Sequence, residues 1–101
     1  MSLADPSKVE ERARQEKESR EQELADFQFI MENPQGRRFM MRMLDMTGFQ
    51  KSSFTGNSTT FFNEGQRNIG LQLWADIQEF PQLYLKMLLE QKEKEKRNAR
   101  R

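Results

Sequence analysis

The sequence alternates stretches of helical apolar spacing with residues that end helices, and this alternation restricts the fold more than any other feature. Apolar residues recur three and four positions apart from Leu24 to Met31 and from Phe39 to Leu44, which is the spacing of one helix face. Pro34, Gly48 and Pro81 interrupt this spacing, because the residue before a proline leaves the helical region and a glycine often ends a helix. The sequence therefore predicts an all-α protein, a small bundle of about four helices.

Both ends of the chain are charged helical extensions of this bundle. Between Glu10 and Glu23 the only apolar residue is Ala13, so this segment has no stripe with which to enter a core. From Lys92 to Arg101 there are six basic and two acidic side chains, and the apolar anchoring is lost again. We therefore predict three parts: a charged helical arm at 1–24, a helical core domain at 25–91 and a basic C-terminal tail at 92–101.

Side-chain spacing within the arm predicts a marginal helix. Ser7 and Glu10 are placed as a capping box. Glu10 with Arg14, and Glu16 with Arg20, are spaced for ion pairs, each worth only about 0.2–0.5 kcal/mol. A solvated helix and a helix docked on a polar partner both fit this composition.

The third predicted helix, from a cap at Ser58 to about Glu79, contains two glycines. Gly65 and Gly70 each cost about 1 kcal/mol relative to alanine in a helix interior. Their natural use is the close approach of another backbone or of a bulky ring. The apolar stripe of this helix is predicted to comprise Phe62, Ile69, Leu73 and Ile77.

Methionines and leucines on the second and fourth predicted helices indicate packing surfaces. Thioethers are soft ligands that need a suitable metal, so the methionines are interpreted as adaptable core filling. Leu85 and Leu89 form a second apolar face on the fourth helix, which predicts contact with two neighbours. The methionines concerned are Met40, Met41, Met43 and Met46.

The most distinctive stretch runs from Phe49 to Leu73, where aromatic residues stand among many Ser, Thr, Gly and Asn residues. Its segments Ser53–Ser58 and Phe62–Gly65, followed by Arg67, Asn68, Gly70 and Leu71, resemble a family of small tailed-phage structural proteins typified by one from a Bordetella podovirus. The resemblance spans Asp26 to Glu90. It indicates a structural or interaction motif made of Phe54, Gly56, Asn57, Phe62, Asn63, Glu64, Gly65, Arg67, Asn68 and Gly70.

Composition argues against several classes of function. The chain has 101 residues, no cysteine and no histidine, so it lacks a disulfide framework, thiolate ligands and the commonest general base. The carboxylates of the predicted core, Asp45, Glu64, Asp76 and Glu79, assemble no catalytic or metal-binding set. We expect no enzymatic activity, no cofactor, no bound metal and no membrane-spanning segment, since the apolar runs are only a few residues long.

Basic residues provide candidate contacts to phosphate groups, although the formal net charge is only +1. Glutamates interleaved among the basic residues at 92–96 weaken the local potential of the tail. A solvated helix end is therefore the favoured interpretation of the tail, and nonspecific DNA contact is the alternative. The candidate phosphate contacts are Arg37, Arg38, Lys96, Arg97, Arg100 and Arg101.

The family resemblance implies a phage protein that acts in the virion and is made in the cytoplasm of the bacterial host. The leading hypothesis is a multicopy structural protein, either at the portal or tail or among the internal proteins released with the genome. Its expected partners are other phage virion proteins and further copies of itself. The alternatives are a small DNA-associated or regulatory phage protein, and a scaffold or assembly chaperone that leaves before maturation.

Overall fold

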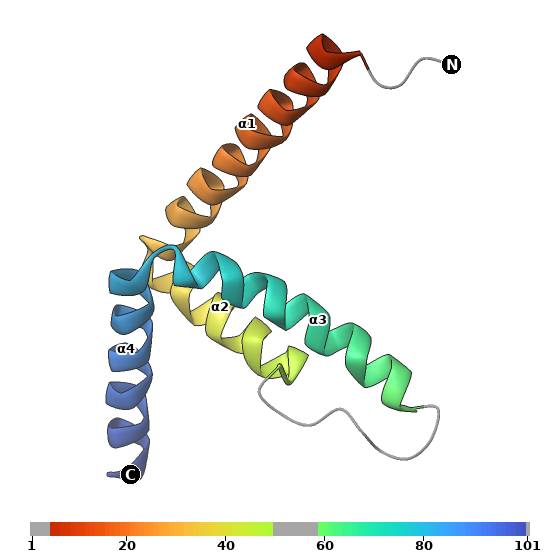
Figure 1. The fold of residues 1–101 in the computed structure, drawn as a ribbon. Helices are drawn as coiled ribbons and strands as arrows, with labels where there is room; N and C mark the ends of the chain where they lie inside the picture. The colour runs from red at the N-terminus through yellow and green to blue at the C-terminus, as the bar shows by residue number, and fades with distance from the viewer. Residues whose placement is uncertain (1–4, 50–58, 101) are drawn as a thin grey trace.

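The computed structural model describes residues 5–49 and 59–100, and this part of the chain forms four α-helices and no strand. Figure 1 shows that the four helices spread from a common junction rather than forming a parallel stack. The prediction of an all-α protein with about four helices is confirmed. The helices are α1 (Pro6–Met31), α2 (Pro34–Thr47), α3 (Thr59–Gln78) and α4 (Pro81–Ala99).

Three of the helices begin with a proline in the first turn, where the missing backbone N–H has no helical partner to lose. The cap of α1 is Asp5, whose carboxylate accepts a hydrogen bond from the Ser7 backbone N–H at 3.0 Å. The capping box predicted at Ser7 and Glu10 is therefore wrong, because the helix starts two residues earlier than that box requires. A carboxylate at this position also interacts favourably with the helix dipole.

The end of α2 agrees with the sequence prediction. Gly48 follows the last helical residue with φ of 60°, a left-handed conformation that residues with a Cβ rarely adopt. Its backbone N–H bonds to the Asp45 carbonyl at 3.3 Å. The predicted cap of the third helix, Ser58, lies outside the described residues.

The chain is extended for its size. Its radius of gyration is 18.7 Å, whereas a compact domain of this length has about 13 Å. α2 packs against each of the other three helices, and α3 also packs against α4. α1 projects from this junction, and its residues are exposed as far as Glu23 (Figure 1). The first two thirds of α1 thus form an arm without a core of its own.

The core is small and lies where the four helices meet. Around it, Trp74 contacts Phe49 with ring centroids 5.5 Å apart and Tyr84 at 5.0 Å in an edge-to-face arrangement. Such aromatic pairs contribute about 0.5–1.5 kcal/mol beyond their buried area. The buried apolar side chains in the described part are Phe27, Met31, Met40, Leu44, Ile77 and Met87.

Several residues predicted to be in the core are exposed instead. Ile69 is 56% exposed and Met46 is 64% exposed, so the predictions of a stripe through Ile69 and of core filling by Met46 are wrong. The buried face of α3 is rotated and contains Gly70 and Ile77. Leu85 and Leu89 of α4 are also more than half exposed, so the described helices cover the second apolar face of α4 only in part.

The two glycines of α3 differ in their surroundings. A Cβ added at Gly70 would lie 2.2 Å from Thr47 Oγ1 and 2.6 Å from Phe49 Cβ, so the predicted close approach is present there. A Cβ added at Gly65 meets no described atom within 4 Å. The close-packing explanation therefore applies to Gly70 and not to Gly65.

The ion pairs of the arm differ from the predicted ones. Arg14 lies 3.8 Å from Glu11 rather than pairing with Glu10. Arg20 pairs with Glu23 at 3.3 Å and donates a hydrogen bond to Asp76 of α3 at 2.6 Å, rather than pairing with Glu16. The hydrogen bond to Asp76 raises the pKa of Arg20 above its ordinary value. This bond connects the middle of the arm to α3.

Candidate functional site

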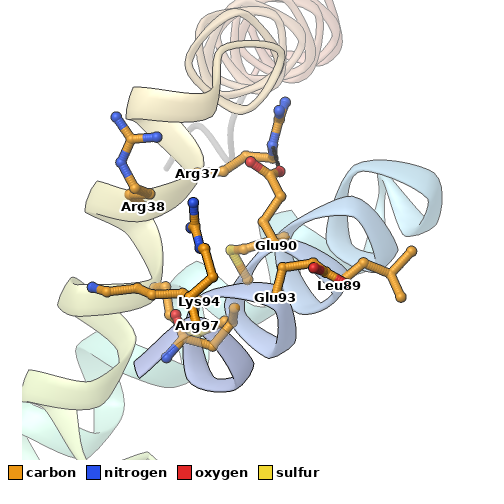
Figure 2. Close-up of a pocket in the computed structure, with 10 residues that line it drawn as sticks. Arg37, Arg38, Leu89, Glu90, Glu93, Lys94 and Arg97 are labelled. Carbon is orange, nitrogen blue, oxygen red and sulfur yellow. Dashed lines mark hydrogen bonds and ion pairs between the residues drawn. The ribbon is translucent and has the colours of Figure 1, made fainter. Parts of the chain in front are cut away.

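The described chain has a surface groove between α2 and α4, with a cavity of about 340 Å³. We call it the α2–α4 groove. Figure 2 shows Arg38 of α2 on one side of it and Lys94 and Arg97 of α4 on the other. Methionine and leucine side chains form its apolar part. The residues that line it are Arg37, Arg38, Met41, Met87, Leu89, Glu90, Gln91, Glu93, Lys94 and Arg97.

Arg37 stabilises the walls of this groove from inside. It is only 5% exposed, and its Nη1 donates a hydrogen bond to the Met31 carbonyl at 2.7 Å. Its Nε donates to the Glu90 carboxylate of α4, and Figure 2 shows the two side chains facing each other. Arg37 therefore connects the end of α1, α2 and α4. It was a candidate phosphate contact, but its donors are directed to partners within the chain.

The other cations of the groove are accessible. Arg38, Lys94 and Arg97 are exposed, and none of them has an ion pair or side-chain hydrogen bond among the described residues. Because these donors are free, an acidic or phosphate-bearing partner gains charge-assisted hydrogen bonds without breaking internal ones.

A second hollow of about 400 Å³ adjoins the first and extends the groove along α2. The two share Arg38, Met41, Gln91 and Lys94. The second hollow adds Arg42, whose guanidinium carbon lies 5.3 Å from the centre of the Phe39 ring, within the range of a cation–π contact. The groove is thus elongated and carries cations along its length.

The remaining predicted phosphate contacts do not line the groove. Lys96 and Arg100 are exposed on and after the last turns of α4, and Arg101 lies outside the described residues. Sequence reasoning counted Lys94 among the basic residues of the tail that could contact phosphates, but it did not single out Glu90 as a member of a site. The repeated positive charge of α4 was a signal for Lys94, whereas no local pattern indicates that Glu90 contacts Arg37, 53 residues away.

The described part of the motif that carried the family resemblance lies on α3, apart from the groove. Asn63, Glu64 and Arg67 are half-buried, Gly65 and Asn68 are exposed, and Gly70 is buried. None of these residues lines the groove. The other members, Phe54, Gly56 and Asn57 together with the side chain of Phe62, lie outside what the structure describes.

Within residues 5–49 and 59–100, no group of three or more acidic residues gathers in a way that suits a metal ion. No helix in this part combines the length and the apolar character that crossing a membrane requires.

Comparison with known proteins connects this geometry with a family. The sequence profile of the family described as Bbp19-like phage protein matches residues 27–88, which is more than half of the chain and agrees with the predicted span. The match begins at buried Phe27 and ends one residue after buried Met87, so it covers the part in which the helices pack. No curated protein and no solved structure shows significant similarity to the chain. The resemblance noted in the sequence is thus confirmed, and the chain belongs to the family of Bbp19-like phage proteins.

Proposed function

We propose that this phage protein is a non-enzymatic structural component of the virion, present in several copies. It would be made in the cytoplasm of the bacterial host and then join other virion proteins, either at the portal or tail or among the internal proteins released with the genome. Membership in a phage family supports a role in the phage life cycle. The exposed apolar surface supports the more specific role in assembly.

The observation that carries the proposal is the balance between exposed and buried apolar side chains. In the described part of the chain, nine large apolar residues are exposed and only six are buried. Single exposed apolar residues are ordinary. An extended chain with a small core and several such residues has apolar surface that partner proteins can bury. The exposed residues are Val9, Phe29, Ile30, Phe39, Met46, Ile69, Leu71, Leu85 and Leu89.

Quantitative mass spectrometry of purified particles tests the proposal. We expect the protein in mature virions, at several copies relative to a known single-ring component. Presence in immature particles and absence from mature virions would instead identify a scaffold or assembly chaperone. Absence from both kinds of particle would contradict a virion role.

The second candidate is a DNA-associated or regulatory phage protein, and the accessible cations Arg38, Lys94 and Arg97 favour it. This candidate predicts that a labelled DNA duplex shows higher fluorescence anisotropy when the protein is added at low ionic strength. The affinity should fall steeply with added salt, because phosphate contacts release counterions. A duplex whose anisotropy does not change at low salt would remove this candidate.

A further inference from the structure

Charge is divided unequally between two parts of the described chain. From Asp5 to Glu32, α1 and its two caps carry nine acidic and five basic side chains, a net charge of −4. α2 and α4, together with the cap Arg100, carry nine basic and four acidic side chains, a net charge of +5. Up to Glu23 the arm itself carries seven acidic and five basic side chains, a net charge of −2, so the arm and the helices that form the groove are oppositely charged.

We propose that the α2–α4 groove of one copy binds the acidic helical arm of a second copy of this chain. The inference rests on the proposed multicopy role and names the surfaces that join neighbouring copies. The groove does not receive the arm of its own chain, because α1 and α4 extend in opposite directions from the junction (Figure 1). The contact between Arg37 and the Met31 carbonyl fixes the end of α1 in this arrangement.

One face of α1 supplies carboxylates for this contact. Glu18 is exposed and has no ion pair among the described residues. Arg20, which binds Asp76 of its own α3, lies on a different face, so the acidic face remains accessible. Spacings of seven, eight and eleven residues return to the same side of a helix. The members of the acidic face are Glu10, Glu11, Glu18 and Glu21, of which Glu11 and Glu21 pair with Arg14 and Lys17 of the same helix at 3.8 and 4.0 Å.

The groove suits a helix of mixed charge better than it suits a phosphodiester backbone. Its cations are interrupted by Glu93 in the first hollow and Asp45 in the second, and these carboxylates repel phosphates. An arm also carries basic residues, such as Arg12, which has no ion pair among the described residues and is available to such carboxylates. The apolar part of the groove, including Met41, accepts the methylene stems of long charged side chains.

The geometry of this contact defines the kind of assembly. The arm and the groove are different surfaces, so the contact is heterologous, and every copy both donates an arm and receives one. If the rotation that relates one copy to the next brings the last copy back to the first, such contacts produce a closed ring, and otherwise they produce a filament. A closed ring is compatible with a position at the portal or tail.

Light scattering of the full chain provides the first test. At about 0.05 M NaCl we expect the mean mass to rise with protein concentration. At the same protein concentration, the mean mass should be lower in about 0.5 M NaCl, because screening weakens contacts between exposed charges. Glu18→Lys should raise the concentration needed for association about tenfold. Glu16→Lys is the matched control, since it makes the same charge change on the opposite face and should have little effect.

A charge exchange between two variants tests the pairing of the surfaces directly. One variant carries Glu10→Lys and Glu18→Lys in the arm, and the other carries Lys94→Glu and Arg97→Glu in the groove. Each alone should associate about tenfold less well than the natural chain, and an equimolar mixture should recover association, because each reversed arm then meets a reversed groove. None of the four residues has an ion pair with another described residue, so far-ultraviolet circular dichroism and Trp74 fluorescence should be unchanged.

Three outcomes would overturn the inference. The first is a mass that does not depend on salt, and the second is a mixture that associates no better than its two components. The third is a chain that stays monomeric until DNA is added and whose DNA binding is lost with Lys94→Glu and Arg97→Glu, which would assign the groove to phosphodiesters. If virions nevertheless contain the protein in several copies, the virion proposal stands and only the arm-to-groove contact fails.

Discussion

Gly70→Leu should leave the core unfolded, and Gly70→Ala should lower the free energy of unfolding by up to about 2 kcal/mol. A Cβ at this position would lie 2.2 Å from Thr47 Oγ1 and 2.6 Å from Phe49 Cβ. Thr47 is not free to move aside, since its hydroxyl donates a hydrogen bond to the Leu44 carbonyl at 2.7 Å. Overpacking costs about 1–3 kcal/mol, and the better helix propensity of alanine offsets about 1 kcal/mol of it.

Urea unfolding followed by Trp74 fluorescence measures this effect, because Trp74 contacts Phe49 beside the glycine. Gly65→Ala is the control on the same helix. Its Cβ enters open space among the described residues, so the substitution should raise stability by about 1 kcal/mol through helix propensity alone. A Gly70→Ala chain as stable as the Gly65→Ala chain would show that α2 and α3 do not approach as closely as the structure indicates.

Arg37→Met should lower the free energy of unfolding by about 2–3 kcal/mol, since it removes a buried cation and leaves its partners unsatisfied. The Met31 carbonyl loses its 2.7 Å hydrogen bond at the end of α1. The cost from Glu90 is smaller, because its side chain is 37% exposed and water rehydrates it. Methionine retains most of the side-chain volume, so the loss reflects the polar contacts rather than a cavity.

Arg38→Met is the matched control for this prediction. Arg38 is the next residue on α2, is exposed and has no internal partner, so its replacement should change stability by no more than about 0.5 kcal/mol. A double-mutant cycle of Arg37→Met with Glu90→Gln, followed by urea unfolding, isolates the coupling between the two side chains. Equal effects of Arg37→Met and Arg38→Met would refute the structural role of Arg37.

The helices and their ends were predictable from sequence because local chemistry determines them. Pro34, Gly48 and Pro81 act within one or two residues of where they stand, and α2 and α4 begin or end there as predicted. The rotation of α3 was not predictable in the same way. Its apolar spacing allowed Ile69 to face the core, but the close approach of Thr47 and Phe49 at Gly70 turns another face inward.

The candidate site was predicted only in part. The sequence indicated that Arg38 and Arg97 carry accessible charge, which a local count of basic residues is enough to reveal. It could not show that Arg38 and Arg97 lie on opposite sides of one groove. It also could not show that Arg37 donates to Glu90 instead of being free to bind a phosphate. Both relations depend on how α2 packs against α4. A close approach at Gly36, where an added Cβ would lie 1.9 Å from the Ile30 carbonyl oxygen, was also missed, because it depends on how the chain turns from α1 into α2.

The projecting arm has a consequence for how the chain opens. Isolated helices of about 12–15 residues are marginal in water, and the first turns of α1 are exposed along their whole length. Protection of the backbone amides against hydrogen exchange should therefore decline along α1 from Met31, which is fully buried, toward Pro6. A partner that covers the arm would protect the amides near Pro6 as well, and the decline along α1 would disappear. Hydrogen exchange along this one helix therefore reports whether the arm is bound.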